Sequence, residues 1–194
     1  DFLQYDCKGH VGFLAYPNSN VSRSATGIIH DSLAIYRKAT AQAGVKLLVH
    51  FSGVWDGVAL QDHPEWAAVD ADKKPSDKYT STFGPYVTQR MIPQMKEIVD
   101  RYDIDGFWVD GDCWGAAVDY CPQAIEQFQK ITGQAKPPTA PGQPQWATWT
   151  RIHREQFFRY VKTYTDAMHD YCKDRTRKHG RKLKPAPLQI ASNW

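Results

Sequence analysis

Val45-Lys46-Leu47-Leu48-Val49-His50-Phe51 is a run of mostly apolar and β-branched residues that lies between Gly44 and Gly53. A run of this length and composition, bounded by glycines, is typical of a strand that is buried on both faces. The segment Ile104 to Val109 has the same character and ends at Asp110-Gly111-Asp112. Because strands buried on both faces belong to parallel sheets, helices must carry the chain between them.

Helical patterns occur where such connections are needed. The predicted helices are Ile28–Ala43, Tyr86–Tyr102, Tyr120–Ile131 and Trp149–Lys173; two further predicted strands are Asp1–Cys7 and Leu188–Ser192; the predicted loops are Gly9–Thr26, Ser52–Phe83 and Gln134–Pro144. The alternation of strands and helices predicts an α/β fold with a parallel sheet. Two architectures fit this order: a doubly wound sheet, or part of a (β/α)8 barrel, which typically needs about 250 residues.

Composition limits the possible function classes. The chain has 194 residues, of which 42% are apolar and 23% charged, so we expect residues 1–194 to form one domain. No apolar run reaches the length of a transmembrane helix. Four cysteines (Cys7, Cys113, Cys121 and Cys172) have no zinc-ligand spacing, and either a bridge or free thiols would fit.

Basic residues cluster between Lys173 and Lys184, where seven Lys and Arg accompany one acid. Nucleic-acid binding is one interpretation of such a cluster, and a solvated helix end is the other. We favour the helix end, because no aromatic residue interrupts the run and no nucleic-acid motif accompanies it. No nucleic-acid partner is therefore expected.

Polar and aromatic residues follow every predicted strand at its carboxyl end, where parallel α/β folds bind ligands. These residues are Asp6, Lys8 and His10; His50, Ser52, Trp55 and Asp56; Asp110, Asp112 and Trp114; and Ser192, Asn193 and Trp194. The strand beginnings carry no comparable groups. Agreement among four strands predicts a functional site at this edge of the sheet.

Asp110 and Asp112 are the candidate catalytic residues. If the strand stays extended past Val109, their side chains point to the same face. A carboxylate there can act as nucleophile, general base or metal ligand, whereas Asp beside Gly111 can also simply cap a turn. A glycosidase needs a second acid across the bond, and the candidates are Asp112, Asp56, Asp6, the loop residue Glu65, or a residue beyond Trp194.

Several of these segments together resemble the α-L-fucosidase-like glycoside hydrolases of family 29 and related bacterial glycosyl hydrolases. The segments are Val45–Asp56, His63–Trp66, Asp72–Pro75, Phe83–Tyr86, Tyr102–Trp114 and Gln189–Trp194. The resemblance implies a (β/α)8 barrel, of which this chain would hold about half as a partial catalytic domain. It also implies an oligosaccharide or polysaccharide substrate, no cofactor, and a secreted or periplasmic protein.

The resemblance assigns the nucleophile of a retaining mechanism to Asp110, in the segment Trp108-Val109-Asp110-Gly111. Relatives carry Glu where this chain has Asp112, which leaves a catalytic and a binding role both open for that residue. The residues expected to bind the sugar, by hydrogen bonds or by stacking, are Asp6, His10, His50, Trp55, Asp56, Trp114, Asn193 and Trp194.

Two other function classes fit the same residues. A metal-dependent polysaccharide hydrolase or deacetylase could use Asp6, His10, His50 and Asp110 as ligands, although the chain has no HxH pair. Loss of activity with a chelator would favour that class. A non-catalytic carbohydrate-binding fragment would instead bind an oligosaccharide without turning it over.

Overall fold

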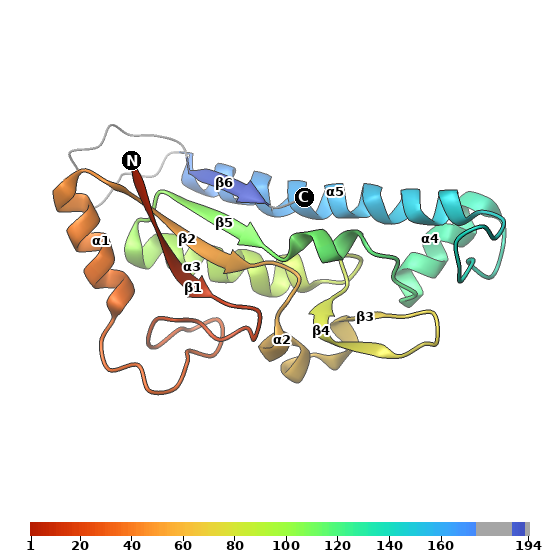
Figure 1. The fold of residues 1–194 in the computed structure, drawn as a ribbon, viewed down its shortest axis with the longest axis horizontal. Helices are drawn as coiled ribbons and strands as arrows, with labels where there is room; N and C mark the ends of the chain where they lie inside the picture. The colour runs from red at the N-terminus through yellow and green to blue at the C-terminus, as the bar shows by residue number, and fades with distance from the viewer. Residues whose placement is uncertain (174–187, 193–194) are drawn as a thin grey trace.

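The computed structural model describes residues 1–173 and 188–192 (Figure 1). Its strands are β1 (Phe2–Lys8), β2 (Lys46–Ser52), β3 (Ala67–Val69), β4 (Pro75–Thr80), β5 (Gly106–Asp110) and β6 (Gln189–Ser192). Its α-helices are α1 (Ser32–Ala43), α2 (Gly57–Asp62), α3 (Ile92–Tyr102), α4 (Pro122–Thr132) and α5 (Trp146–Cys172). Three short helical segments complete the fold: η1 (Pro64–Trp66), the π-helical η2 (Val87–Met91) and η3 (Asp112–Ala116).

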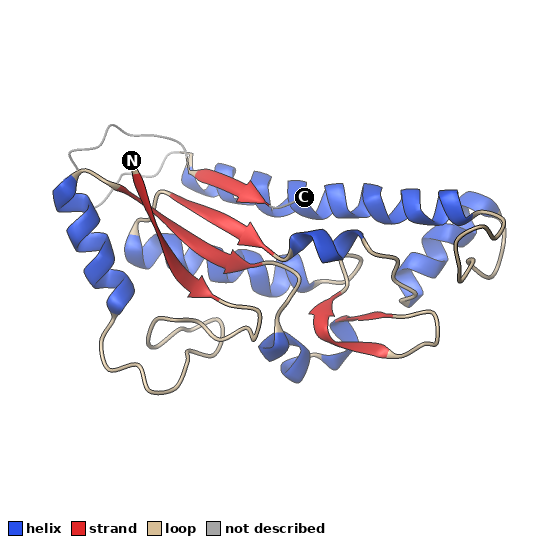
Figure 2. Ribbon diagram, in the orientation of Figure 1, coloured by secondary structure: helices blue, strands red, loops and turns tan. Residues whose placement is uncertain are grey.

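The main sheet is parallel, as the sequence predicts, and has the order β1-β2-β5-β6 (Figure 2). Its strands lie side by side in chain order, without the reversal of a doubly wound sheet. Within the described residues the sheet is open, so they form no closed barrel. What the structure confirms is therefore an α/β fold with a parallel sheet.

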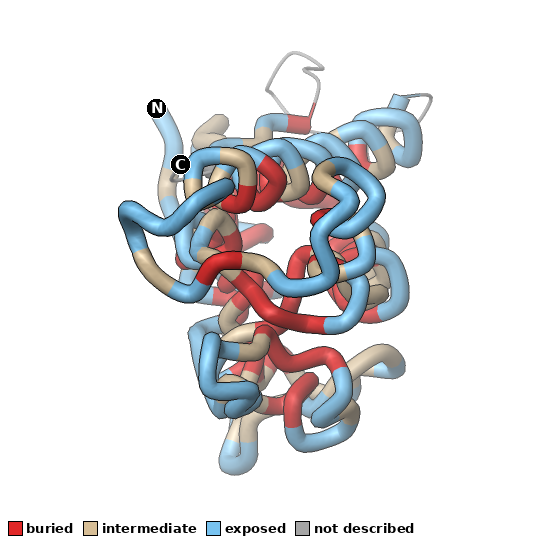
Figure 3. The backbone as a smooth tube through the Cα atoms, turned by 90° about the vertical axis from the view of Figure 1, so that its right-hand side faces the viewer, coloured by how far each residue is buried: buried red, intermediate tan, exposed pale blue. Residues whose placement is uncertain are grey.

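The core lies on the face of the sheet that the helices cover. Leu47, Val49 and Phe51 from β2 and Phe107 and Val109 from β5 are fully buried in one hydrophobic cluster. The same cluster includes side chains of α3 and α5, two helices that pack against each other. Buried segments accordingly lie inside the molecule, beneath exposed loops and outer helix faces (Figure 3).

Side chains on the opposite face of the sheet are more exposed. Asp6 is exposed, and His50, Trp108 and Asp110 are half-buried. Alternation along the strands explains the contrast, because successive side chains point to opposite faces. Asp6, His50 and Asp110, three of the polar residues predicted at the strand ends, therefore project from the face that lies away from the core.

Two predictions about local structure are wrong. The segment Ser52–Phe83 is not one long loop: it contains α2, η1 and the antiparallel hairpin β3–β4. Strand β3 has only three residues and β4 carries the charged residues Asp77 and Lys78, so apolar alternation marks neither strand. The first helix begins at Ser32 rather than Ile28, because the side chain of Asp31 caps it by accepting from the backbone N–H of Ala34 at 3.1 Å.

Thiol chemistry and membrane crossing can also be judged from the structure. None of the four cysteines, all of which lie in the described residues, forms a disulfide. No helix in residues 1–173 and 188–192 is both long and apolar enough to span a bilayer.

Candidate active site

The register of the main sheet sets up the candidate site. Asp6 of β1 pairs with His50 of β2, which pairs with Trp108 of β5, and Ser52 pairs with Asp110 one step further along. Neighbouring residues in a parallel sheet project to the same face, so these side chains form rows at the carboxyl edge. The sequence-based prediction of converging strand ends is realised for these three strands.

Asp110 is held by His50 of β2 and by the loop that follows Asp110 itself. His50 Nε2 lies 3.2 Å from Oδ2 of Asp110, and its Nδ1 lies 3.2 Å from Oδ1 of Asp6. The backbone N–H of Gly111 donates to Oδ1 of Asp110 at 2.7 Å. The Asp110 side chain is 24% exposed, so the carboxylate is fixed in orientation yet accessible.

His10 approaches the same carboxylate from the loop after β1. Its Nε2 lies 3.8 Å from Oδ2 of Asp110, and its Nδ1 lies 2.8 Å from the hydroxyl of Ser52. Its ring packs against Trp55 with centroids 5.1 Å apart. Gly111 permits this packing, since it has φ +75° and an added Cβ would lie 3.1 Å from His10 and 3.3 Å from Trp55.

Aromatic rings extend the site beyond the carboxylate. Trp55 makes an edge contact with Trp114 at 5.9 Å between centroids and a tilted contact with Tyr79 at 6.2 Å. Trp114 is 53% exposed although it is large and apolar. These rings suit stacking on the apolar faces of sugars, which is the role that the sequence analysis expected for Trp55 and Trp114.

Asp112 does not join Asp110. The left-handed conformation of Gly111 ends the extended strand, so the predicted i, i+2 alignment is wrong. The Asp112 carboxylate is fully buried on the core side, where the hydroxyls of Tyr164 and Tyr160 donate to it at 2.8 and 3.2 Å. A side chain at Gly53 would collide with this carboxylate.

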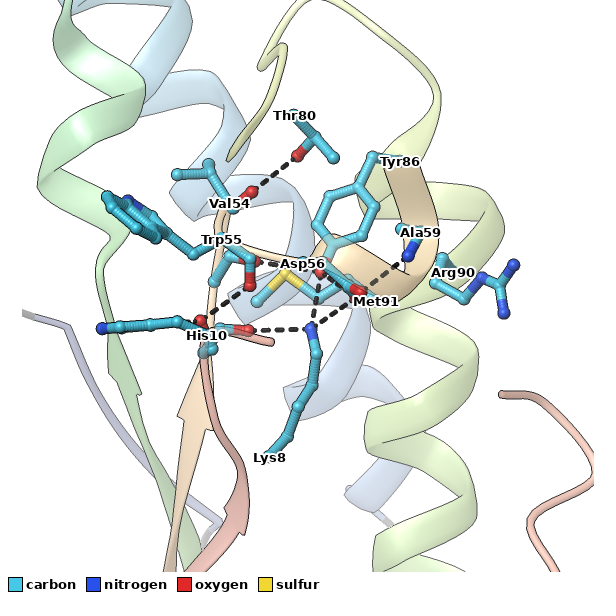
Figure 4. A network of polar contacts seen from close by, with 12 residues as sticks. Lys8, His10, Val54, Trp55, Asp56, Ala59, Thr80, Tyr86, Arg90 and Met91 are labelled. Atoms are coloured by element: carbon cyan, nitrogen blue, oxygen red, sulfur yellow. Dashed lines mark hydrogen bonds and ion pairs between the residues drawn. The ribbon is translucent and has the colours of Figure 1, made fainter. Parts of the chain in front are cut away.

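Asp56 is also absent from the group around Asp110. It is fully buried, its Oδ2 lies 2.8 Å from Nζ of Lys8, and its Oδ1 accepts from the backbone of Ala59 to cap α2 (Figure 4). Tyr86 donates to Asp56 at 3.0 Å and lies 2.7 Å from Nζ of Lys8. Burial lowers the pKa of Lys8, and the Asp56 charge opposes that shift.

The described group around Asp110 does not include the remaining predicted residues. Asn193 and Trp194 lie outside the described residues. Glu65 is exposed and contacts His63 at 3.1 Å. For the metal hypothesis, the part of the chain that the structure describes contains no group of three or more His, Cys, Asp or Glu side chains arranged to hold an ion.

Sequence comparison identifies the family. Residues 5–111, just over half of the chain, match the family described as hypothetical glycosyl hydrolase 6. The chain belongs to this hypothetical glycosyl hydrolase 6 family. The matched segment runs from β1 to Gly111 and so contains the contacts that fix Asp110. A comparison with curated proteins finds no match.

Two solved structures resemble this member of the hypothetical glycosyl hydrolase 6 family. Alpha-L-fucosidase isoenzyme 2 from Paenibacillus thiaminolyticus aligns with a TM-score of 0.66 and 21% identity, over 96% of this chain and 26% of that chain. This chain therefore spans about a quarter of the fucosidase. A hypothetical protein from Ruminiclostridium thermocellum ATCC 27405 aligns with a TM-score of 0.57 and 10% identity, over 98% of this chain and 81% of that chain. Similarity at these identities shows a shared fold.

Trp108 and Tyr86 were not predicted as site residues from the sequence, whereas Lys8 was expected among the polar groups at the strand ends. Trp108 packs against His50 with centroids 5.1 Å apart, and its alternation with Asp110 along β5 could have placed it on that face. Lys8 and Tyr86 support the turn after β2: Lys8 donates to the carbonyl of Ser52 at 3.0 Å, and the Tyr86 hydroxyl lies 2.9 Å from the carbonyl oxygen of Gly53. A bulge between Asp6 and Lys8 turns Lys8 inward, and no sequence signal marks that bulge.

Proposed function

We propose that this protein is a glycoside hydrolase of the α-L-fucosidase-like type, in which Asp110 attacks the anomeric carbon or stabilises the oxocarbenium-like transition state. The observation that carries the proposal is the Asp110 carboxylate itself, held by His50 and Gly111 beside His10 on the open face of the sheet. Family membership supports the reaction class. We further propose that the sheet is about half of a (β/α)8 barrel, which agrees with its chain-order strands.

The neighbours of Asp110 have binding roles in this proposal. His10 and His50 would hydrogen-bond the hydroxyls of an oligosaccharide or polysaccharide, and Trp55 and Trp114 would stack against its rings. Retaining and inverting glycosidases both require a second carboxyl group, which protonates the leaving oxygen. Asp6, on the other edge of the His50 ring, is a described carboxylate on this face. No step in the scheme uses a cofactor.

Matched Asp→Asn variants test the role of Asp110. With an aryl glycoside that the wild-type protein hydrolyses, Asp110→Asn should abolish turnover. The unfolding temperature should stay nearly unchanged, because the Asp110 carboxylate is partly exposed. Asp112→Asn should lower the unfolding temperature, because it weakens buried hydrogen bonds from two tyrosines. Turnover at the wild-type rate by Asp110→Asn would remove Asp110 from the nucleophile role.

A further inference from the structure

Ser52 is the last residue of β2 and is fully buried. Its hydroxyl oxygen lies 2.8 Å from the backbone carbonyl of Trp55 and 2.8 Å from Nδ1 of His10. Because it is inaccessible, Ser52 cannot itself contact a carbohydrate. Whatever it contributes to the site must act through the residues that it holds.

Only one assignment of donors and acceptors satisfies both of these hydrogen bonds. A serine hydroxyl has a single hydrogen to donate, and a backbone carbonyl can only accept. The hydroxyl hydrogen of Ser52 therefore points to Trp55, and its oxygen accepts a hydrogen from Nδ1 of His10. His10 keeps a proton on Nδ1 in both of its charge states, so Nε2 is the nitrogen that gains or loses a proton.

Nε2 of His10 faces the candidate nucleophile. It lies 3.8 Å from Oδ2 of Asp110, and His50, whose Nε2 contacts that oxygen at 3.2 Å, has its ring centroid 6.5 Å from that of His10. Among the residues that the structure describes, Asp110 and His50 are the charged or titratable groups in contact with the His10 ring. Trp55 and Gly111 fix the ring from its other sides, and Figure 4 shows His10 and Trp55 projecting in the same direction.

We propose that Ser52 is a positioning residue that fixes the tautomer of His10 and thereby directs the proton-exchanging nitrogen at Asp110. When Nε2 holds a proton, a cationic donor lies beside the nucleophile; when it does not, a lone pair faces the same oxygen. The catalytic consequence rests on the proposed glycosidase function, whereas the tautomer does not.

Nitrogen NMR of the imidazole rings tests the tautomer without any substrate. In ¹⁵N-labelled wild-type protein with an uncharged His10 ring, Nδ1 of His10 should have the chemical shift of a protonated nitrogen and Nε2 that of an unprotonated one. The signals are assigned by their loss in His10→Gln. A protonated Nε2 with an unprotonated Nδ1 in the uncharged wild-type ring would overturn the proposal, even if no serine variant folds.

Ser52→Ala removes the acceptor and should move proton occupancy from Nδ1 to Nε2 of His10. Ser81→Ala is the matched control, because Ser81 is a buried serine that donates instead to Asp119. This control should leave the His10 signals unchanged. An unaltered tautomer in folded Ser52→Ala would show that Ser52 does not set it.

Activity measurements separate this proposal from the proposed function. Ser52→Ala should lower kcat/KM by roughly tenfold, the effect of one lost hydrogen bond, and displace the pH profile, whereas Ser81→Ala should do neither. A profile that does not move would contradict the catalytic consequence. Full turnover by Asp110→Asn would contradict the glycosidase mechanism and leave the NMR result standing.

Discussion

At the scale of single residues, the buried pair of Lys8 and Asp56 stabilises the turn after β2, next to the candidate site. Both side chains are fully buried, and their charges are 2.8 Å apart. Lys8→Met should destabilise the protein by about 3–5 kcal/mol, because it leaves the Asp56 carboxylate buried without its counter-ion. Urea unfolding followed by circular dichroism measures this loss.

The double variant Lys8→Met/Asp56→Asn is the informative control for that loss. It removes both charges, and Asn retains an oxygen that can accept from Ala59 and cap α2. We therefore expect it to be more stable than Lys8→Met alone, since an isolated buried charge costs more than a neutral pair. Equal instability of the two variants would mean that the Lys8 side chain matters for packing rather than charge.

Glycine at position 111 shows why the candidate site could be predicted only in part. The apolar run of β5 and the acids after it place Asp110 at a strand end, and that placement needs only the sequence pattern. The positive φ of Gly111 then sends Asp112 to the core, a choice that also depends on Tyr160 and Tyr164 of α5, about fifty residues away. Tertiary contacts of this kind leave no local signal.

At the scale of elements, the strands β2 and β5 of the main sheet could be predicted from the sequence, whereas the strands of the hairpin could not. Long apolar runs predict β2 and β5 because burial on both faces requires such residues. Strand β3 has only three residues, and β4 carries charged residues and is held to the rest of the molecule by contacts such as the hydrogen bond from the Thr80 N–H to the Val54 carbonyl at 2.8 Å. Such a strand is stabilised by its neighbours rather than by its own composition.

His153 makes the packing of α5 sensitive to acid. It is fully buried; its Nδ1 donates to the Trp149 carbonyl at 2.8 Å, and its Nε2 accepts from the backbone of Asp119 at 2.9 Å. Burial lowers the pKa of His153 below its ordinary 6.5. Below pH 6.5 the unfolded chain therefore binds a proton that the folded protein excludes, and stability falls as pH falls.

That linkage predicts a slope of at most about 1.4 kcal/mol per pH unit from this group between pH 6.5 and the lower folded pKa. Urea unfolding between pH 5 and pH 7 measures the slope. His153→Gln should flatten it, while His30→Gln, the same change at an exposed position, should not. An identical slope in His153→Gln and wild type would assign the acid sensitivity to other groups.

At the scale of the whole molecule, the sheet separates two kinds of chemistry. The face away from the helices carries accessible acids and imidazoles, whereas the core side buries Tyr86, Tyr160 and Tyr164 among apolar residues. Desolvation by burial is the largest cause that raises the pKa of Tyr86 and Tyr160 well above 10, and the nearby carboxylates Asp56 and Asp112, respectively, raise them further. We therefore expect the free energy of unfolding to fall at alkaline pH.

Above pH 10 the tyrosines of the unfolded chain lose protons that the buried tyrosines keep, so stability must fall as pH rises. Each buried tyrosine contributes at most about 1.4 kcal/mol per pH unit. Lys8 acts in the opposite direction, because its lowered pKa lets the folded protein release a proton first, but that contribution ends near the ordinary lysine value of 10.5. Above pH 10.5 the buried tyrosines therefore determine how the stability changes with pH.

Parallel absorbance and circular-dichroism titrations between pH 8 and pH 12 test this expectation. Part of the tyrosinate signal of the ten tyrosines should appear only together with the loss of helical signal. Tyr86→Phe should make the decline of unfolding free energy above pH 10 shallower, since one of the linked protons is gone, whatever its effect at neutral pH. Complete ionisation of all ten tyrosines in a protein that keeps its full helical signal would contradict the linkage.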